Sequence, residues 1–139
     1  MSIDEARELL IQAHKKKAQD ALVEAERNLA AGSPGLSTNR IYYACFYAAT
    51  AVLISRELQF VRHSALKSAV HSQFVRHGEL SPELAAFYEE AFVQRHEADY
   101  NALAKFDPAK VVPQLSKAKQ FVAVMETLLS RRKQDRIDV

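Results

Sequence analysis

The chain is poor in the residues that bridge, break or cap structure. Its 139 residues include one cysteine, three glycines, four prolines and no tryptophan. The single thiol, Cys45, cannot form an internal disulfide or a Cys-x-x-Cys metal or redox site, and its alanine and aromatic neighbours suit a small buried side chain. So few glycines and prolines favour long helices joined by short loops.

The composition excludes further classes of protein. No apolar run is long enough for a transmembrane helix, so we expect no membrane partner. The net charge of +2 gives no general preference for nucleic acid or for a membrane surface. The first ten residues are acidic and amphipathic, unlike a signal peptide, and we predict a cytoplasmic protein. The length indicates a single domain over residues 1–139.

Capping residues and helix breakers divide the chain into five predicted helices, with no strand pattern between them. The helices should span approximately residues 2–31, 38–56, 65–77, 82–104 and 108 onward. The signals at their ends are Ser2 with Glu5, the breaker 32–35, Ser37 or Thr38, Ser64, Gly78, Ser81 with Pro82, and Asp107 with Pro108. Pro113 should bend the last helix or delay its start.

Four of these helices are long and one is short. The last helix has apolar residues that alternate by four and three, the pattern of a helix packed in a bundle. These residues are Val111, Leu115, Ala118, Val122, Met125 and Leu129. Because brief loops place consecutive helices side by side in opposite directions, we predict an all-α fold, an antiparallel four-helix up-down bundle with one additional short helix.

The second predicted helix contains the most informative segment, residues 39–53 (NRIYYACFYAATAVL). Its aromatic residues share one broad helical face, and its alanines are small enough to let another helix approach closely. They are Tyr42, Tyr43, Phe46 and Tyr47, with Ala44, Ala48 and Ala51. Arg40 lies in the first turn, where a cation is unfavourable near the helix N-terminus. The aromatic face either packs in a core or meets an anion, and the period does not decide whether Tyr42 or Tyr43 points inward.

Residues 92–100 (FVQRHEADY) of the fourth predicted helix form a second informative segment. Arg95 occupies a position in the apolar stripe of this helix, where an unpaired cation is costly. Asp99 lies one turn later and can pair with it, and Tyr100 follows directly. The segment therefore predicts either an arginine held by Asp99 in a polar groove or a structural ion pair that ties two helices or two subunits together.

His63 stands next to Ser64 at the predicted start of the third helix. The N-terminus of a helix offers free backbone N–H groups to anions. If this end faces Arg40 and Arg95, the three side chains form a phosphate-sized pocket; otherwise His63 is a solvated loop residue. The histidine spacings match no zinc motif, so we predict no metal site and no cofactor.

Together these segments resemble the HEPN superfamily of small helical proteins, and within it the group labelled UPF0332. The matching pieces are RIYYACFYAA at 40–49, His63 with Ser64, and RHEADY at 95–100, in an order that covers roughly residues 36–100. The resemblance implies a helical bundle that forms a homodimer through its long helices. It also implies a minimal nucleotidyltransferase partner in a toxin–antitoxin or stress system. Active HEPN members are metal-independent ribonucleases with an Arg followed, after four to six residues, by His.

The chain departs from this ribonuclease motif. Counting on from Arg95, the positions for the histidine hold Tyr100, Asn101 and Ala102. His96 is adjacent to Arg95 and points about 100° away on a helix. Tyr100, with an ordinary pKa of about 10, is a poor general base. The sequence therefore predicts no ribonuclease activity by the family mechanism.

Three hypotheses remain for the function. The first is a non-catalytic HEPN module that binds a nucleotide or RNA in a dimer cleft, with Tyr and Arg side chains holding bases and phosphate. Its predicted ligand-binding residues are Arg40, Tyr43, Tyr47, His63, Arg95, Asp99 and Tyr100. The second is a divergent metal-independent ribonuclease that uses Arg95 with His96 or Tyr100. The third is a purely structural dimerisation or assembly protein.

Overall fold

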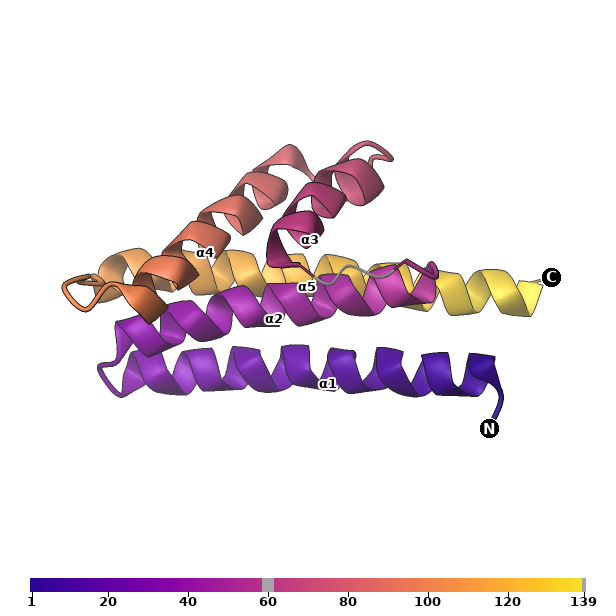
Figure 1. Ribbon diagram of the computed structural model, residues 1–139, viewed down its shortest axis with the longest axis horizontal. Helices are drawn as coiled ribbons and strands as arrows, with labels where there is room; N and C mark the ends of the chain where they lie inside the picture. The colour runs from indigo at the N-terminus through magenta and orange to yellow at the C-terminus, as the bar shows by residue number, and fades with distance from the viewer. Residues whose placement is uncertain (59–61, 139) are drawn as a thin grey trace.

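The computed structural model describes residues 1–58 and 62–138, with side chains through residue 132, and this part of the chain is helical without any strand (Figure 1). The elements are α1 (Ile3–Ala30), α2 (Pro34–Ser55), α3 (His63–Ala69), the π-helical segment η1 (Val70–Val75), α4 (Pro82–Tyr100) and α5 (Pro108–Asp138). Across the described residues, no helix combines the length and the apolar character that crossing a membrane requires.

The four long helices alternate in direction along the chain. In Figure 1, α1 runs antiparallel to α2 and α5, and the three lie side by side, while α4 slants across α2 with α3 next to it. The α2 helix packs against α1, α4 and α5, so it forms the centre of the bundle. The predicted all-α up-down bundle, with four long helices and one short helix, is confirmed.

The contact between α1 and α2 is lined by small side chains. Alanines recur at helical spacing on both partners and all are buried; they are Ala18, Ala21 and Ala25 on α1, with Ala44, Ala48 and Ala51 on α2. Because no long side chain separates them, the two backbones can lie at the short end of the usual interaxial distance of about 8–10 Å. The alanines of residues 39–53 therefore allow another helix to approach α2 closely, as the sequence predicted.

The aromatic residues of α2 divide between the core and the surface. Tyr42 is fully buried, whereas Tyr43 is half-buried, which decides the alternative that the helical period left open. Tyr42 contacts Tyr88 of α4 with 5.7 Å between ring centroids, and Tyr88 stacks on Phe121 of α5 at 5.4 Å. This chain of rings joins the three helices, and it leaves Tyr43 at the edge of the core.

The start of α2 differs from the prediction. The helix begins at Pro34, before the expected caps Ser37 and Thr38, because proline suits the first helical position. Both hydroxyls are used elsewhere: Ser37 donates to the carbonyl of Ala25 in α1 at 2.8 Å, and Thr38 donates to the carbonyl of Pro34 at 2.9 Å. Of the predicted breaker, Gly32 makes the turn, with φ of +79°.

The third predicted helix is displaced at both ends. It begins at His63, whose side chain is fixed on α2, so Ser64 lies inside the helix rather than capping it. At its other end it widens into the π-helical segment Val70–Val75 and stops before the predicted His77. Gly78 has φ of +71° and makes the expected turn.

The connection from α4 to α5 is longer than predicted. The α4 helix ends at Tyr100 rather than Ala104, because Asn101 takes an extended backbone and its side-chain oxygen accepts the N–H of Leu103 at 3.0 Å. The α5 helix begins as predicted: Asp107 accepts the N–H of Ala109 at 2.9 Å. Pro113 lies inside α5 and so does not delay its start.

Candidate functional site

Arg95 lies on the inner side of α4, and only 9% of its surface is exposed. Three aromatic rings surround the guanidinium. Its central carbon Cζ lies 5.1 Å from the centroid of the Tyr42 ring, 5.7 Å from that of Phe92 and 5.9 Å from that of Tyr43. These three rings and Arg95 are called the Arg95 cage below. The faces of the rings attract the positive charge of the guanidinium. They do not act as hydrogen-bond acceptors for its N–H groups, which point outward in the guanidinium plane.

The guanidinium makes no hydrogen bond with any residue that the structure describes. Among the described residues, the carboxylate that pairs with it is Asp99, with 3.7 Å between Nη1 and Oδ2, and its buried Nε has no partner. The other oxygen of Asp99 accepts a hydrogen bond from Asn39 of α2 at 2.8 Å, which helps to hold the carboxylate in place. A buried donor without an acceptor costs about 1–3 kcal/mol. The sequence correctly placed Arg95 beside Asp99, but at 3.7 Å the pair leaves the arginine's donors without a hydrogen bond to the described residues.

His63 reaches the same cluster from the start of α3. Its Nδ1 lies 2.7 Å from the hydroxyl oxygen of Tyr42, and its ring stacks on Phe46 with 4.3 Å between centroids. Burial, and then the positive charge of Arg95, lower the pKa of His63 below 6.5, so the imidazole is neutral at pH 7. Burial raises the pKa of Tyr42 to about 12, so its hydroxyl keeps its proton. His63 is thus part of the cluster and not a solvated loop residue.

Arg40 also lies next to the Tyr43 ring. Its Cζ is 5.1 Å from the centroid of the Tyr43 ring. The Tyr43 ring therefore has two guanidinium groups as neighbours, those of Arg40 and Arg95. Unlike Arg95, Arg40 is partnered: Nε donates to Asn39 at 2.9 Å and Nη1 to Glu24 of α1 at 3.4 Å. Arg40, Tyr43, His63, Arg95 and Asp99 are therefore brought together around one aromatic cluster.

Tyr47 extends this surface along α2 toward α1. Its ring centroid lies 5.7 Å from that of Tyr43, and the ammonium of Lys17 lies 5.5 Å from the Tyr47 ring. On the opposite side, the ammonium of Lys67 in α3 lies 4.8 Å from the Phe92 ring. Cations thus accompany the aromatic side chains on both sides of the cage.

Several members of the site were not among the predicted ligand-binding residues; they are Tyr42, Phe92, Lys17, Lys67 and Asn39. Lys67 could have been found, because it follows His63 by one helical turn and so shares its face. Asn39 links Arg40 to Asp99 by accepting from one and donating to the other. Its contact with Asp99 joins residues far apart in the sequence, so no local pattern could have predicted it.

Tyr100 and His96 lie away from the cage. Tyr100 is 71% exposed, and its ring centroid is 4.8 Å from that of His96, which is exposed as well. The structure therefore does not bring these two candidates to Arg95. Nor does it assemble three or more His, Cys, Asp or Glu side chains into a metal-binding group among the described residues.

Comparison with known proteins identifies relatives across most of the chain. The HEPN domain model matches residues 11–134. A UPF0332 protein of Thermotoga maritima is 32% identical over 123 residues, which cover 88% of this chain and 93% of the relative. A protein of Methanocaldococcus jannaschii named "Putative toxin MJ0142" is 29% identical over 96 residues, 64% of this chain and 65% of that protein.

Proposed function

The chain belongs to the HEPN family, and on that premise we propose that it is a binding module whose Arg95 cage holds a phosphate group of RNA or of a nucleotide. One observation carries the proposal: a buried guanidinium that makes no hydrogen bond with the described residues. Phosphate oxygens accept two parallel N–H groups of an arginine, and this charge-assisted pairing is about twice as strong as a neutral hydrogen bond. A bound phosphate supplies the acceptors that Arg95 lacks.

The surroundings of the cage favour a ligand that also carries bases. Tyr43 and Tyr47 are half-buried, so part of each ring remains accessible beside Arg40 and Lys17. Stacking of a base on an aromatic side chain contributes about 1–3 kcal/mol and tolerates any sequence. Aromatic rings interleaved with cations suit single-stranded RNA, with bases on the tyrosines and phosphates at the arginines and lysines.

Ribonuclease activity by the family motif is not part of this proposal. The histidine that the motif requires is absent from its expected place, and His96 lies on the exposed side of α4. We propose that the module acts with a minimal nucleotidyltransferase partner in a toxin–antitoxin or stress system. The resemblance to HEPN proteins supports this role, and so does the name of the Methanocaldococcus relative.

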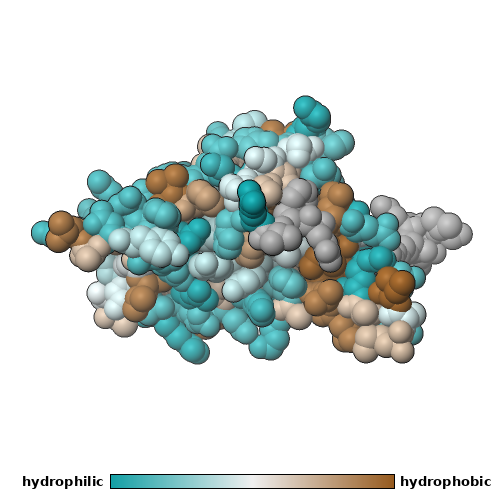
Figure 2. All heavy atoms as spheres, in the orientation of Figure 1, coloured by the Kyte–Doolittle hydropathy of each residue, from teal (hydrophilic) through white to brown (hydrophobic). Residues whose placement is uncertain are grey.

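We also propose that the chain forms a homodimer. Large apolar side chains are exposed near the start of α1, among them Ile3, Leu9 and Leu10, and Figure 2 shows hydrophobic residues gathered at that end of the molecule. An exposed apolar patch of this kind is typical of an interaction surface. Light scattering coupled to gel filtration measures the mass; a Leu10→Glu variant should shift a dimer toward the monomer, and a monomeric wild-type chain would refute the proposal.

The RNA proposal is tested by fluorescence anisotropy with a labelled single-stranded oligonucleotide. Arg95→Gln removes the charge and the fork of donors, and Arg95→Lys keeps only the charge. We expect both variants to weaken binding by about tenfold or more, since a hydrogen bond to a charged group contributes about 1.5–3 kcal/mol. Arg27→Gln is the matched control, because Arg27 is an exposed arginine outside the cage. Folded Arg95 variants that bind as tightly as the control would refute the proposal.

One observation favours a second candidate, a metal-independent ribonuclease. The neutral His63 imidazole lies next to the cage, where it can accept a proton. The 2′-hydroxyl proton would pass to its imidazole as the 2′-oxygen attacks the phosphorus, and the 5′-oxygen would leave with a proton from water. Cleavage of RNA in the presence of EDTA, lost in His63→Gln while binding persists, would establish this activity in place of a pure binding role.

A further inference from the structure

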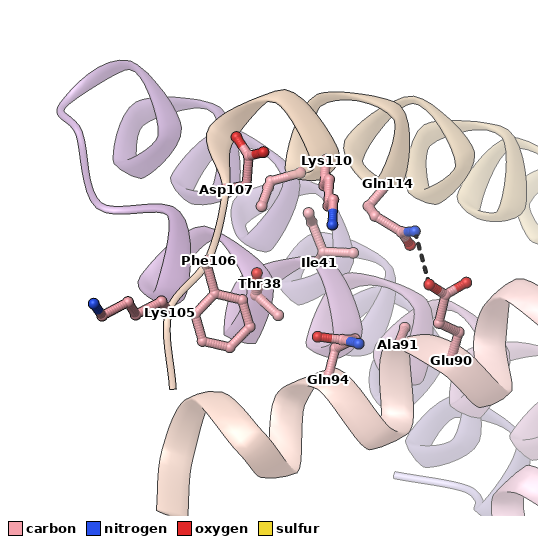
Figure 3. A pocket seen from close by; sticks show the side chains of 11 residues that line it. Thr38, Ile41, Glu90, Ala91, Gln94, Lys105, Phe106, Asp107, Lys110 and Gln114 are labelled. Carbon is pink, nitrogen blue, oxygen red and sulfur yellow. Dashed lines mark hydrogen bonds between the residues drawn. The ribbon is translucent and has the colours of Figure 1, made fainter. Parts of the chain in front are cut away.

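A cavity of about 280 Å³ lies between α2, α4 and the start of α5 (Figure 3). Its apolar lining comes from buried aliphatic side chains, those of Ile41, Ala91 and Val111. Phe106 adds a half-buried ring that packs on the first turn of α2, where a Cβ built on Gly35 would lie 3.4 Å from its Cδ2 atom. No residue of the Arg95 cage lines the cavity, so it is separate from the proposed RNA site.

Four polar side chains line the same cavity as two facing pairs. Glu90 and Gln94 are one helical turn apart on α4, so they share a face. Lys110 and Gln114 are likewise one turn apart on α5. Since α4 and α5 run in opposite directions, Glu90 lies opposite Gln114, from which it accepts a hydrogen bond at 3.3 Å.

The second pair, Gln94 and Lys110, has no partner. Figure 3 shows the two side chains directed toward the cavity from facing walls. Neither makes a hydrogen bond or an ion pair with the residues that the structure describes. Their amide and ammonium N–H groups are therefore available to an acceptor in the cavity.

The lining carries charges of both signs. Lys105 and Lys110 contribute two ammonium groups, and Glu90 and Asp107 contribute two carboxylates. Asp107 is used as the cap of α5, because it accepts the N–H of Ala109 at 2.9 Å. Glu90 keeps its second oxygen, Oε2, without a hydrogen bond to the described residues. Such a balanced set of charges favours a ligand that itself carries one charge of each sign, and it disfavours a polyanion.

We propose that this cavity binds a free α-amino acid with an apolar side chain, such as L-leucine. The carboxylate of the amino acid accepts from Gln94 and Lys110, and its ammonium donates to the unused oxygen of Glu90. Because one carbon atom carries both charged groups, partners one turn apart on α4 can reach both. The apolar side chain packs on Ile41 and Val111. The volume, at the lower limit of about 300 Å³ for ligand pockets, suits so small a ligand. The proposal does not rest on RNA binding.

Calorimetric titration of the full chain with L-leucine tests the proposal. We expect Lys110→Met and Glu90→Gln each to weaken binding by about tenfold or more, because each variant removes one charge and keeps the length of the side chain. The matched controls are Lys117→Met and Glu83→Gln, which change exposed residues of the same two helices outside the cavity lining. No binding of L-leucine to the wild-type chain would overturn the proposal, and so would cavity variants that bind as tightly as the controls.

Ligand analogues separate a free amino acid from the end of a polypeptide. N-acetyl-L-leucine lacks the ammonium and represents a C-terminus, whereas L-leucinamide lacks the carboxylate and represents an N-terminus. Glycine has both charged groups and no side chain. Each should bind at least tenfold more weakly than L-leucine, since one of the three contacts is missing. An analogue that binds as tightly as L-leucine would overturn the proposal.

Nuclear magnetic resonance locates the ligand. Methyl resonances of Ile41 and Val111 should shift on addition of L-leucine, while ring resonances of Tyr43 should stay in place. Shifts confined to Tyr43 would put the amino acid at the Arg95 cage and refute the proposal. Oligonucleotide binding measured on Lys110→Met separates the two sites, because RNA binding at the cage predicts no change in this variant.

Discussion

Replacement of Arg95 by methionine distinguishes a binding role from a structural one. Methionine keeps much of the aliphatic volume and can fill the space between Tyr42, Tyr43 and Phe92. If Arg95 and Asp99 were a structural buried ion pair, breaking it would cost about 3–5 kcal/mol, because one charge would be left buried without a partner. If Arg95 is instead held ready for a ligand, its removal should cost little.

The structure gives the expected size of the change. The 3.7 Å contact with Asp99 involves a carboxylate that is 26% exposed and already hydrogen-bonded to Asn39, so its loss costs less than about 1 kcal/mol. The contacts with the three rings contribute about 1–2 kcal/mol. Removing the unpartnered Nε returns about 1–3 kcal/mol. These contributions nearly cancel, so Arg95→Met should change the free energy of unfolding by no more than about 1 kcal/mol.

Urea denaturation followed by circular dichroism measures this free energy. We expect Arg95→Met to shift the midpoint by no more than about 0.3–1 M urea, since the slope for a small domain is about 1–3 kcal/mol per molar. The same protein should have lost its affinity for the oligonucleotide. A loss of 3 kcal/mol or more, on the scale of a broken buried ion pair, would refute the reasoning and return Arg95 to a structural role.

Three further predictions concern His63, two glycines and Cys45. The pKa of His63 is lower in the folded chain than the ordinary 6.5, so the unfolded chain takes up a proton at this histidine first as the pH falls. The stability that neutral His63 contributes is therefore present above pH 6.5 and is lost below it. Between pH 7.5 and 5, the melting temperature should fall less steeply in His63→Gln than in the wild-type chain. Gly35→Ala should stabilise the fold by about 0.5 kcal/mol, because Gly35 lies inside α2 with an ordinary helical backbone. Gly78→Ala should destabilise the fold by about 1 kcal/mol, because Gly78 has φ of +71°. Thermal melts of the two variants measure both changes. Cys45 is buried and its pKa is raised by burial, so iodoacetamide should label it only after unfolding.

Local signals predicted the helices and the burial of Arg95. The period of the α5 stripe from Val111 to Leu129 is correct at every predicted position, since each of those side chains is buried. Arg95 occupies its stripe position as the spacing required. These features depend on the helical period, which acts within a few turns of one helix. The sequence therefore predicted the fold class and which side of α4 faces the core.

Contacts between helices could not be predicted in the same way. Tyr42 and His63 meet because α3 crosses next to α2, and Asn39 reaches Asp99 because α4 slants over the start of α2. The start of α2 was misplaced because Ser37, a suitable cap by type, donates instead to a carbonyl of α1. In each case a tertiary contact competes with the local preference.

The case for Arg95 rests finally on a comparison within the chain. Five arginines among the described side chains are less than a third exposed, and four of them donate hydrogen bonds to side-chain oxygens within 3.5 Å; these four are Arg7, Arg40, Arg56 and Arg132. Arg95 is the most buried of the five, at 10% side-chain exposure, and it makes no such bond. Burial raises the cost of an unmade hydrogen bond, so a structural arginine at this depth should have the most acceptors rather than the fewest. The buried Nε of Arg132 also has no partner among the described residues, but its Nη2 donates to Glu8. Of these five arginines, Arg95 alone donates no hydrogen bond, which is what a ligand-binding arginine requires.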